Sequence, residues 1–159
     1  MQLCTLIKSK IFDAAEHCLD DINEPEDEIL YGTAGYLQTL LLIKKEIGLA
    51  MGPLVKGDID VRSFWEDFIA RLNSIIKQIT IKLMTQTSLS IENGTKTILQ
   101  ANWPRHRRRG SLYIGGAHGT LGILYTVLQA CLMDETILLE KEDALSIIVA
   151  TCEDLLKLQ

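Results

Sequence analysis

The chain has 159 residues, of which 47% are hydrophobic and 23% are charged, and its formal net charge is −5. This length fits one domain or a part of a larger one, and the apolar content excludes a disordered chain. The acidic balance argues against general nucleic-acid binding, because that function neutralises phosphates with Lys and Arg. No apolar run reaches the roughly 18 residues of a membrane span, and no secretory signal is visible. We therefore expect a cytoplasmic protein that has no membrane span.

Helical periodicity dominates the chain. Apolar residues spaced three or four apart predict a first helix over residues 3–19, which ends before Pro25. Residues 34–47 predict a second helix that is apolar over most of its surface and should therefore be central. Gly48 and the Gly-Pro pair at residues 52–53 are expected to break it.

The second half of the chain also predicts helices. Asp60 is a candidate N-cap for a third helix over residues 61–84. Residues 97–102 fit one helical turn, and residues 119–133 and 141–158 predict two further helices. The buried stripe of the third helix should consist of Phe64, Phe68, Leu72, Ile75 or Ile76, Ile79 and Leu83. Since no segment requires a strand, the predicted fold class is all-α.

The cysteines match no zinc or redox motif in their spacing. They lie in apolar, helix-like contexts near both ends of the chain, at Cys4, Cys18, Cys131 and Cys152. We interpret them as reduced thiols of a cytosolic protein that act as small apolar residues.

One internal repeat is visible. Residues 32–41 align with residues 119–128 at an offset of 87, and six of the ten positions are identical. Each copy carries Gly-x-x-Gly and opens an apolar helix. The first glycine permits a sharp turn into the helix, and the second permits a close approach of neighbouring backbone. Free N–H groups at such a helix start can bind an anion, although packing alone also explains the pattern.

The repeat and its flanks carry a resemblance to a known family. Residues 27–37 and 113–123 resemble two elements of the eukaryotic lanthionine synthetase C-like (LanC-like) proteins, in the same order. In that family a Leu-Tyr-Gly-Arg-x-Gly-Tyr element precedes a Gly-Ala-Ala-His-Gly-x-x-Gly element. The resemblance implies that residues 1–159 form part of an α/α toroid of helical hairpins.

The resemblance also implies a chemistry. Bacterial members close thioether rings, and eukaryotic members bind glutathione and are linked to its addition to dehydroamino acids in proteins. The family uses zinc to activate the thiol. His118 matches the family's active-site histidine, a candidate general acid, and Glu28 is a candidate orienting carboxylate. Tyr31 is a candidate substrate-binding residue. The structural glycines at the helix starts would be Gly32, Gly35, Gly116, Gly119 and Gly122.

Two departures from the family pattern limit this inference. Thr33 replaces the family's common Arg. The family's zinc ligands come from Trp-Cys and Cys-His-Gly elements, and no cysteine of this chain is followed by Gly or His. No metal ligand is therefore assigned, and the chain is expected to be inactive by itself.

Three alternatives remain open at this stage. The chain could be a non-catalytic helical interaction module that binds a partner or itself through exposed hairpin flanks. The basic run at residues 105–109 could bind an anion or nucleic acid, although the net charge of −5 weakens this reading. An α/α-toroid glycosidase would need paired carboxylates, which the sequence does not pair.

Overall fold

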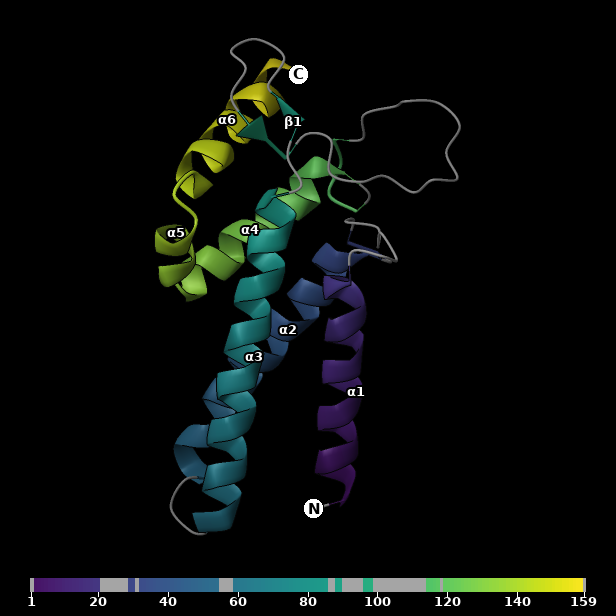
Figure 1. The fold of residues 1–159 in the computed structure, drawn as a ribbon, viewed down its shortest axis with the longest axis vertical. Helices are drawn as coiled ribbons and strands as arrows, with labels where there is room; N and C mark the ends of the chain where they lie inside the picture. The colour runs from purple at the N-terminus through teal and green to yellow at the C-terminus, as the bar shows by residue number, and fades with distance from the viewer. Residues whose placement is uncertain are drawn as a thin grey trace.

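The computed structural model describes residues 2–20, 29–30, 32–54, 59–85, 88–89, 96–98, 114–117 and 119–158, with side chains outside that description at 2–5, 50–54, 59–61 and 88–89. Its elements follow the chain in the order α1 (Gln2–Leu19), α2 (Thr33–Leu54), α3 (Ile59–Thr85), β1 (Ser88–Leu89), β2 (Lys96–Thr97), α4 (Thr120–Met133), α5 (Thr136–Glu140) and α6 (Ala144–Lys157). Figure 1 shows an elongated molecule in which α1, α2 and α3 form one half and α4, α5 and α6 the other. The fold is all-α, as predicted.

The central position of α2 is confirmed, because α2 packs against α1, α3 and α4. Its expected break at Gly48 is wrong, since the helix continues to Leu54 and passes through both the glycine and the Gly-Pro pair at 52–53. A glycine inside a helix costs only about 1 kcal/mol, and Pro53 lies in the last turn, where little helix remains to be disrupted. Packing on three neighbours offsets these local costs.

The other helix boundaries agree with periodicity except in three places. The helix α3 begins at Ile59, so Asp60 lies within its first turn and is not its N-cap. The region predicted as one helix over 141–158 begins later, at Ala144. A short helix, α5, precedes it and was not predicted, because five residues are too few to show a period.

A short strand pair is the second feature that the helical pattern did not predict. Ser88 pairs with Thr97 and Leu89 with Lys96 in an antiparallel arrangement. Thr97 is therefore in a strand and does not begin the helical turn expected over 97–102, of which residues 99–102 lie outside the described part of the chain. The pair is tied to α6, because the backbone N–H of Ile98 donates to Thr151 Oγ1 at 3.0 Å.

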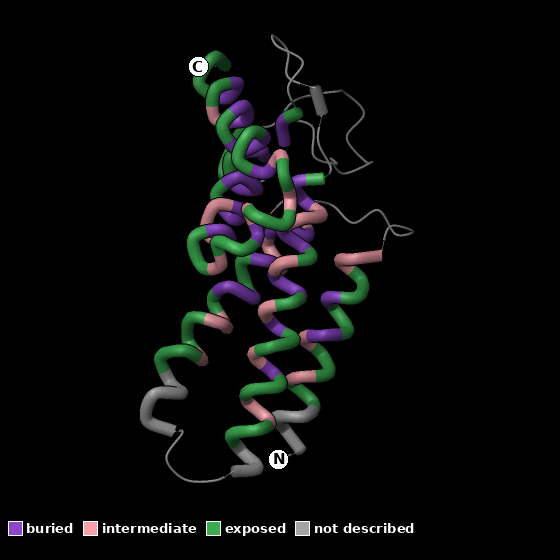
Figure 2. The backbone as a smooth tube through the Cα atoms, turned by 60° about the vertical axis from the view of Figure 1, so that its left-hand side comes forward, coloured by how far each residue is buried: buried purple, intermediate pink, exposed green. Residues whose placement is uncertain are grey.

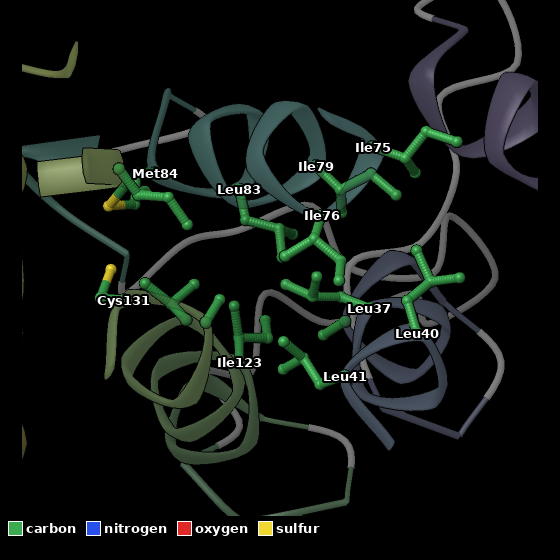
Figure 3. Packing of buried hydrophobic residues seen from close by; sticks show 14 of the residues in the cluster. Leu37, Leu40, Leu41, Ile75, Ile76, Ile79, Leu83, Met84, Ile123 and Cys131 are labelled. Carbon is green, nitrogen blue, oxygen red and sulfur yellow. The ribbon is translucent and has the colours of Figure 1, made fainter. Parts of the chain in front are cut away.

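The hydrophobic core lies where α2, α3 and α4 meet. Figure 3 shows Leu37 and Leu41 of α2, Ile76 and Leu83 of α3, and Ile123 of α4 directed toward one another. The predicted stripe of α3 is confirmed, and its members from Phe68 onward are all buried. Burial of this apolar surface is the main favourable contribution to folding.

Burial is uneven along the molecule. Figure 2 shows that buried residues concentrate at the junction of the helices, whereas the far ends of α1, α2 and α3 are mostly exposed. Several large apolar side chains of α4, α5 and α6 are also exposed, including Leu132 and Leu139. No helix in the described part of the chain is long and apolar enough to cross a membrane.

Candidate functional site

The two glycine elements lie side by side at the starts of α2 and α4. The backbone N–H of Ile29, just before α2, donates a hydrogen bond to the carbonyl of Ala117, just before α4, at 3.2 Å. The Ile29 side chain also reaches the first turn of α4, because a Cβ added at Gly122 would lie 2.8 Å from Ile29 Cδ1. The fold therefore joins two motifs that are far apart in the sequence.

The second glycine of each element allows a close backbone contact. A Cβ at Gly35 would lie 2.7 Å from the carbonyl carbon of Ile29 and nearer still to its oxygen. A Cβ at Gly122 would lie 2.9 Å from the carbonyl carbon of Gly116 and again nearer to the oxygen. In both copies the contacted carbonyl belongs to the residue six positions earlier, so the structural repeat follows the sequence repeat. The prediction that the second glycine permits close approach is confirmed.

The first glycine of the second element does not have the role expected of it. Gly119 is the N-cap of α4 and has φ −135° and ψ −179°. This is an extended conformation that any residue can adopt. The conformational freedom of glycine is therefore not what Gly119 contributes.

The start of α4 is not an open anion site. The N–H of Leu121 donates to the carbonyl of Ile114 at 3.1 Å, and the N–H groups of Gly122 and Ile123 both donate to the Gly119 carbonyl. Backbone donors at a helix start bind an anion only when they have no internal partner. The expectation of free N–H groups is therefore wrong for these three residues of α4.

Threonines reinforce the repeat. Thr39 Oγ1 donates to the Gly35 carbonyl, and Thr126 Oγ1 donates to the Gly122 carbonyl, each at 3.0 Å. Thr33 and its repeat counterpart Thr120 are both buried. The Thr33 hydroxyl has no hydrogen-bond partner among the described residues. A buried polar group without a partner is costly, so this position, where the family commonly has Arg, is locally unsatisfied.

The three residues expected to carry the chemistry lie outside the described residues. They are Glu28, Tyr31 and His118. Their described sequence neighbours Ile29 and Ala117 are the two residues that share the hydrogen bond between the elements. The expected roles of the three residues remain predictions.

The described cysteines lack the character of metal ligands. Cys18, Cys131 and Cys152 are free thiols, as predicted. Burial raises the pKa of Cys18, which Lys82 partly opposes, and burial together with the nearby Asp134 raises the pKa of Cys131. A zinc ligand must be a thiolate, so both environments disfavour the required form. Among the described residues no three His, Cys, Asp or Glu side chains lie close enough to hold a metal ion.

Tyr36 has a structural role that sequence reasoning missed. It lies in the first glycine element, and its hydroxyl donates to the backbone carbonyl of Ile11 in α1. Burial, and to a smaller extent Cys18, raises the pKa of Tyr36 to about 12. The hydroxyl therefore stays protonated and joins α1 to α2. The signal available in the sequence was an aromatic residue next to Gly35 on the otherwise aliphatic face.

A shallow groove of about 160 Å³ separates the middle of α2 from α4, which sequence reasoning also missed. It is lined by Gln38, Leu41, Leu42, Lys45, Tyr125, Thr126, Gln129 and Met133. Its lining holds one charged side chain, that of Lys45, and its walls are mostly apolar, so it is a contact surface between helices more than a reaction site.

Comparison with known proteins agrees with this geometry. No solved structure matches the chain. The family model described as "Lanthionine synthetase C-like protein" matches residues 2–159. That match spans α1 to α6 and includes both glycine elements, which the fold brings together. The chain therefore belongs to the lanthionine synthetase C-like family.

Proposed function

We propose that this chain contributes the paired glycine elements of a site that adds a thiol to a dehydroamino acid. The thiol would be that of glutathione, and the acceptor a dehydroalanine or dehydrobutyrine residue in a peptide. The observation that carries the proposal is the hydrogen bond from Ile29 to Ala117, which holds the two family elements together. Family membership favours this function over a purely non-catalytic interaction module. In this proposal residues 1–159 are one part of a LanC-like toroid.

The proposed reaction is a conjugate addition. The thiolate sulfur forms a bond to the β-carbon of the dehydroamino acid, and the double-bond electrons move to give an enolate. A proton then returns to the α-carbon, and His118 is the proposed donor, since imidazole exchanges protons near neutral pH. Glu28 would orient a catalytic group, and Tyr31 would line the site.

Zinc has no fitting site in the described part of this chain. In the family the metal would supply thiol activation, by lowering the pKa of the bound sulfhydryl. The described thiols have raised pKa values at Cys18 and Cys131, and no described cluster can hold a metal ion. We therefore derive no step through zinc and propose that the 159-residue chain binds its substrates without turnover.

Turnover is tested by mixing the purified chain with glutathione and a dehydroalanine peptide and following the adduct by mass spectrometry. We expect no adduct above the rate measured without protein. Catalysed addition by the purified chain would show that the proposed inactivity is wrong.

Binding is tested separately by titrating the dehydroalanine peptide into the protein in a calorimeter. His118→Ala should weaken binding about fivefold, because one hydrogen bond to the acceptor contributes about 1 kcal/mol. The control is His17→Ala, since His17 is exposed in the last turn of α1. Equal affinities of the two variants would contradict the placement of the acceptor near His118.

We also propose a cytoplasmic location, supported by the three free thiols among the described residues. A fluorescent fusion that localised to the secretory pathway would contradict it.

A further inference from the structure

The groove between α2 and α4 is formed by two different faces of equivalent helices. On the α2 side it is lined by Gln38, Leu41, Leu42 and Lys45. On the α4 side it is lined by Tyr125, Thr126, Gln129 and Met133. Because α2 and α4 are copies of one repeat, each helix must also present the face that its counterpart uses in this contact.

On α4 the equivalent of the contacting α2 face is open. Adding the repeat offset of 87 to the α2 lining gives Tyr125, Leu128, Gln129 and Leu132. Tyr125 is 53% exposed and Leu132 is 80% exposed. Leu121, one turn before Tyr125, is 51% exposed, whereas its counterpart Ala34 on α2 is fully buried. We call Leu121, Tyr125, Leu128 and Leu132 the α4 stripe.

On α2 the equivalent of the contacting α4 face is open as well. Subtracting the same offset from the α4 lining gives Gln38, Thr39, Leu42 and Glu46, which we call the α2 face. Thr39 is exposed although its counterpart Thr126 is fully buried. Both threonines make the same hydrogen bond to a glycine carbonyl, so the two helix surfaces share local geometry and differ in whether a neighbour covers them.

The composition of the α4 stripe suits a helix partner. Its four members recur three or four residues apart, which places them on one side of the helix. All four are apolar or aromatic, whereas the corresponding positions of α2 include the polar Gln38 and Lys45. An apolar stripe of this kind left open to water marks an interaction surface.

We propose that the occupant of the α4 stripe is the α2 face of a second copy of this chain. The contact would copy the α2–α4 packing that already exists within one chain. It is heterologous, since two different surfaces meet, and each copy keeps one free surface at each end of the assembly. Association through it would therefore continue beyond a dimer as concentration rises.

The experiment is sedimentation equilibrium of the full chain over a wide concentration range, with one variant in each surface. Leu132→Glu places a charge on the α4 stripe, and Thr39→Arg places one on the α2 face. We expect the average mass of the unmodified chain to rise with concentration. Each variant alone should associate at least about tenfold more weakly, because an unpaired charge would be buried in the contact.

The mixture of the two variants provides the decisive measurement. The Leu132→Glu chain keeps an intact α2 face, and the Thr39→Arg chain keeps an intact α4 stripe. Together they should form a dimer that cannot grow further. Leu139→Glu is the matched control, since Leu139 on α5 is 79% exposed and lies outside both surfaces. It should associate as the unmodified chain does, and circular dichroism should show the same helix content for every variant.

Three results would overturn the proposal. One is an unmodified chain that stays monomeric at every concentration. Another is a Thr39→Arg chain that still dimerises as strongly as the unmodified chain, which would indicate symmetric pairing of two α4 stripes. The third is a mixture of folded variants that remains monomeric.

Discussion

The contact between Gly122 and the Gly116 carbonyl makes a quantitative prediction for Gly122→Ala. The new Cβ would lie 2.9 Å from the carbonyl carbon of Gly116, nearer still to its oxygen, and 2.8 Å from Ile29 Cδ1. The isoleucine methyl can rotate away, but the carbonyl belongs to the backbone segment that leads into α4. The first turn of α4 must therefore move away from that segment.

The magnitude follows from two opposing effects. Overpacking of a tight site typically costs about 1–3 kcal/mol, and a clash with backbone belongs near the upper end of that range. Replacing glycine by alanine in a helix returns at most about 1 kcal/mol. We therefore expect Gly122→Ala to lower the free energy of unfolding by about 2 kcal/mol.

A matched control isolates the clash. Gly48 is exposed within α2, and a Cβ there would have nothing within 4 Å. Gly48→Ala should therefore raise the free energy of unfolding by about 0.5–1 kcal/mol. Urea unfolding followed by circular dichroism measures both, and with a slope of about 2 kcal/mol per molar the midpoint of Gly122→Ala should fall by about 1 M. A Gly122→Ala midpoint equal to or above that of Gly48→Ala would refute the reasoning.

Three further predictions concern titratable groups. Tyr36→Phe should destabilise the chain by about 1 kcal/mol in urea unfolding, because the hydrogen bond to α1 is lost. In the unmodified protein stability should fall as the pH rises from about 10, the usual tyrosine value, toward the folded pKa of about 12, a loss that the Phe variant should lack. Cys131, 6% exposed and with a raised pKa, should react with iodoacetamide at pH 8 far more slowly in the folded protein than in urea, as peptide mass spectrometry would show. Hydrogen bonds from Lys141 and Lys96 lower the pKa of Asp143, so its stabilising effect should be present above the unfolded pKa of 3.8 and lost as the pH falls through the folded value; Asp143→Asn should unfold with a weaker acid dependence.

The helices could be predicted because their apolar periodicity is long and regular. The stripe of α3 from Phe68 to Leu83 is an example, since a 27-residue helix contains enough turns to show its period. The strand pair and α5 could not be predicted this way, because two and five residues carry no period. The continuation of α2 through Gly48 was missed because a local breaker signal competes with packing on three neighbouring helices.

The candidate site was only partly readable from the sequence. The repeat identified Gly35 and Gly122, and the structure explains both by a close backbone contact. The pairing of Ile29 with Ala117 is a tertiary contact between distant segments, and no local pattern encodes it. The same applies to the donors at the start of α4, whose partners include the carbonyl of Ile114 upstream of the helix. A glycine-rich helix start therefore predicts close packing more securely than it predicts an anion site.

The comparison of the two repeats separates packing from chemistry. The glycine–carbonyl contact and the threonine–glycine hydrogen bond occur in both copies, so packing alone accounts for these residues. Packing does not account for the position just before the first glycine, where one copy has Tyr31 and the other has His118. A tyrosine and a histidine differ in whether they exchange a proton near neutral pH. If the chain takes part in proton transfer, the function should therefore depend on the residue that distinguishes the second repeat, and His118→Tyr, which restores the first repeat's residue, should abolish it while the glycine contacts persist.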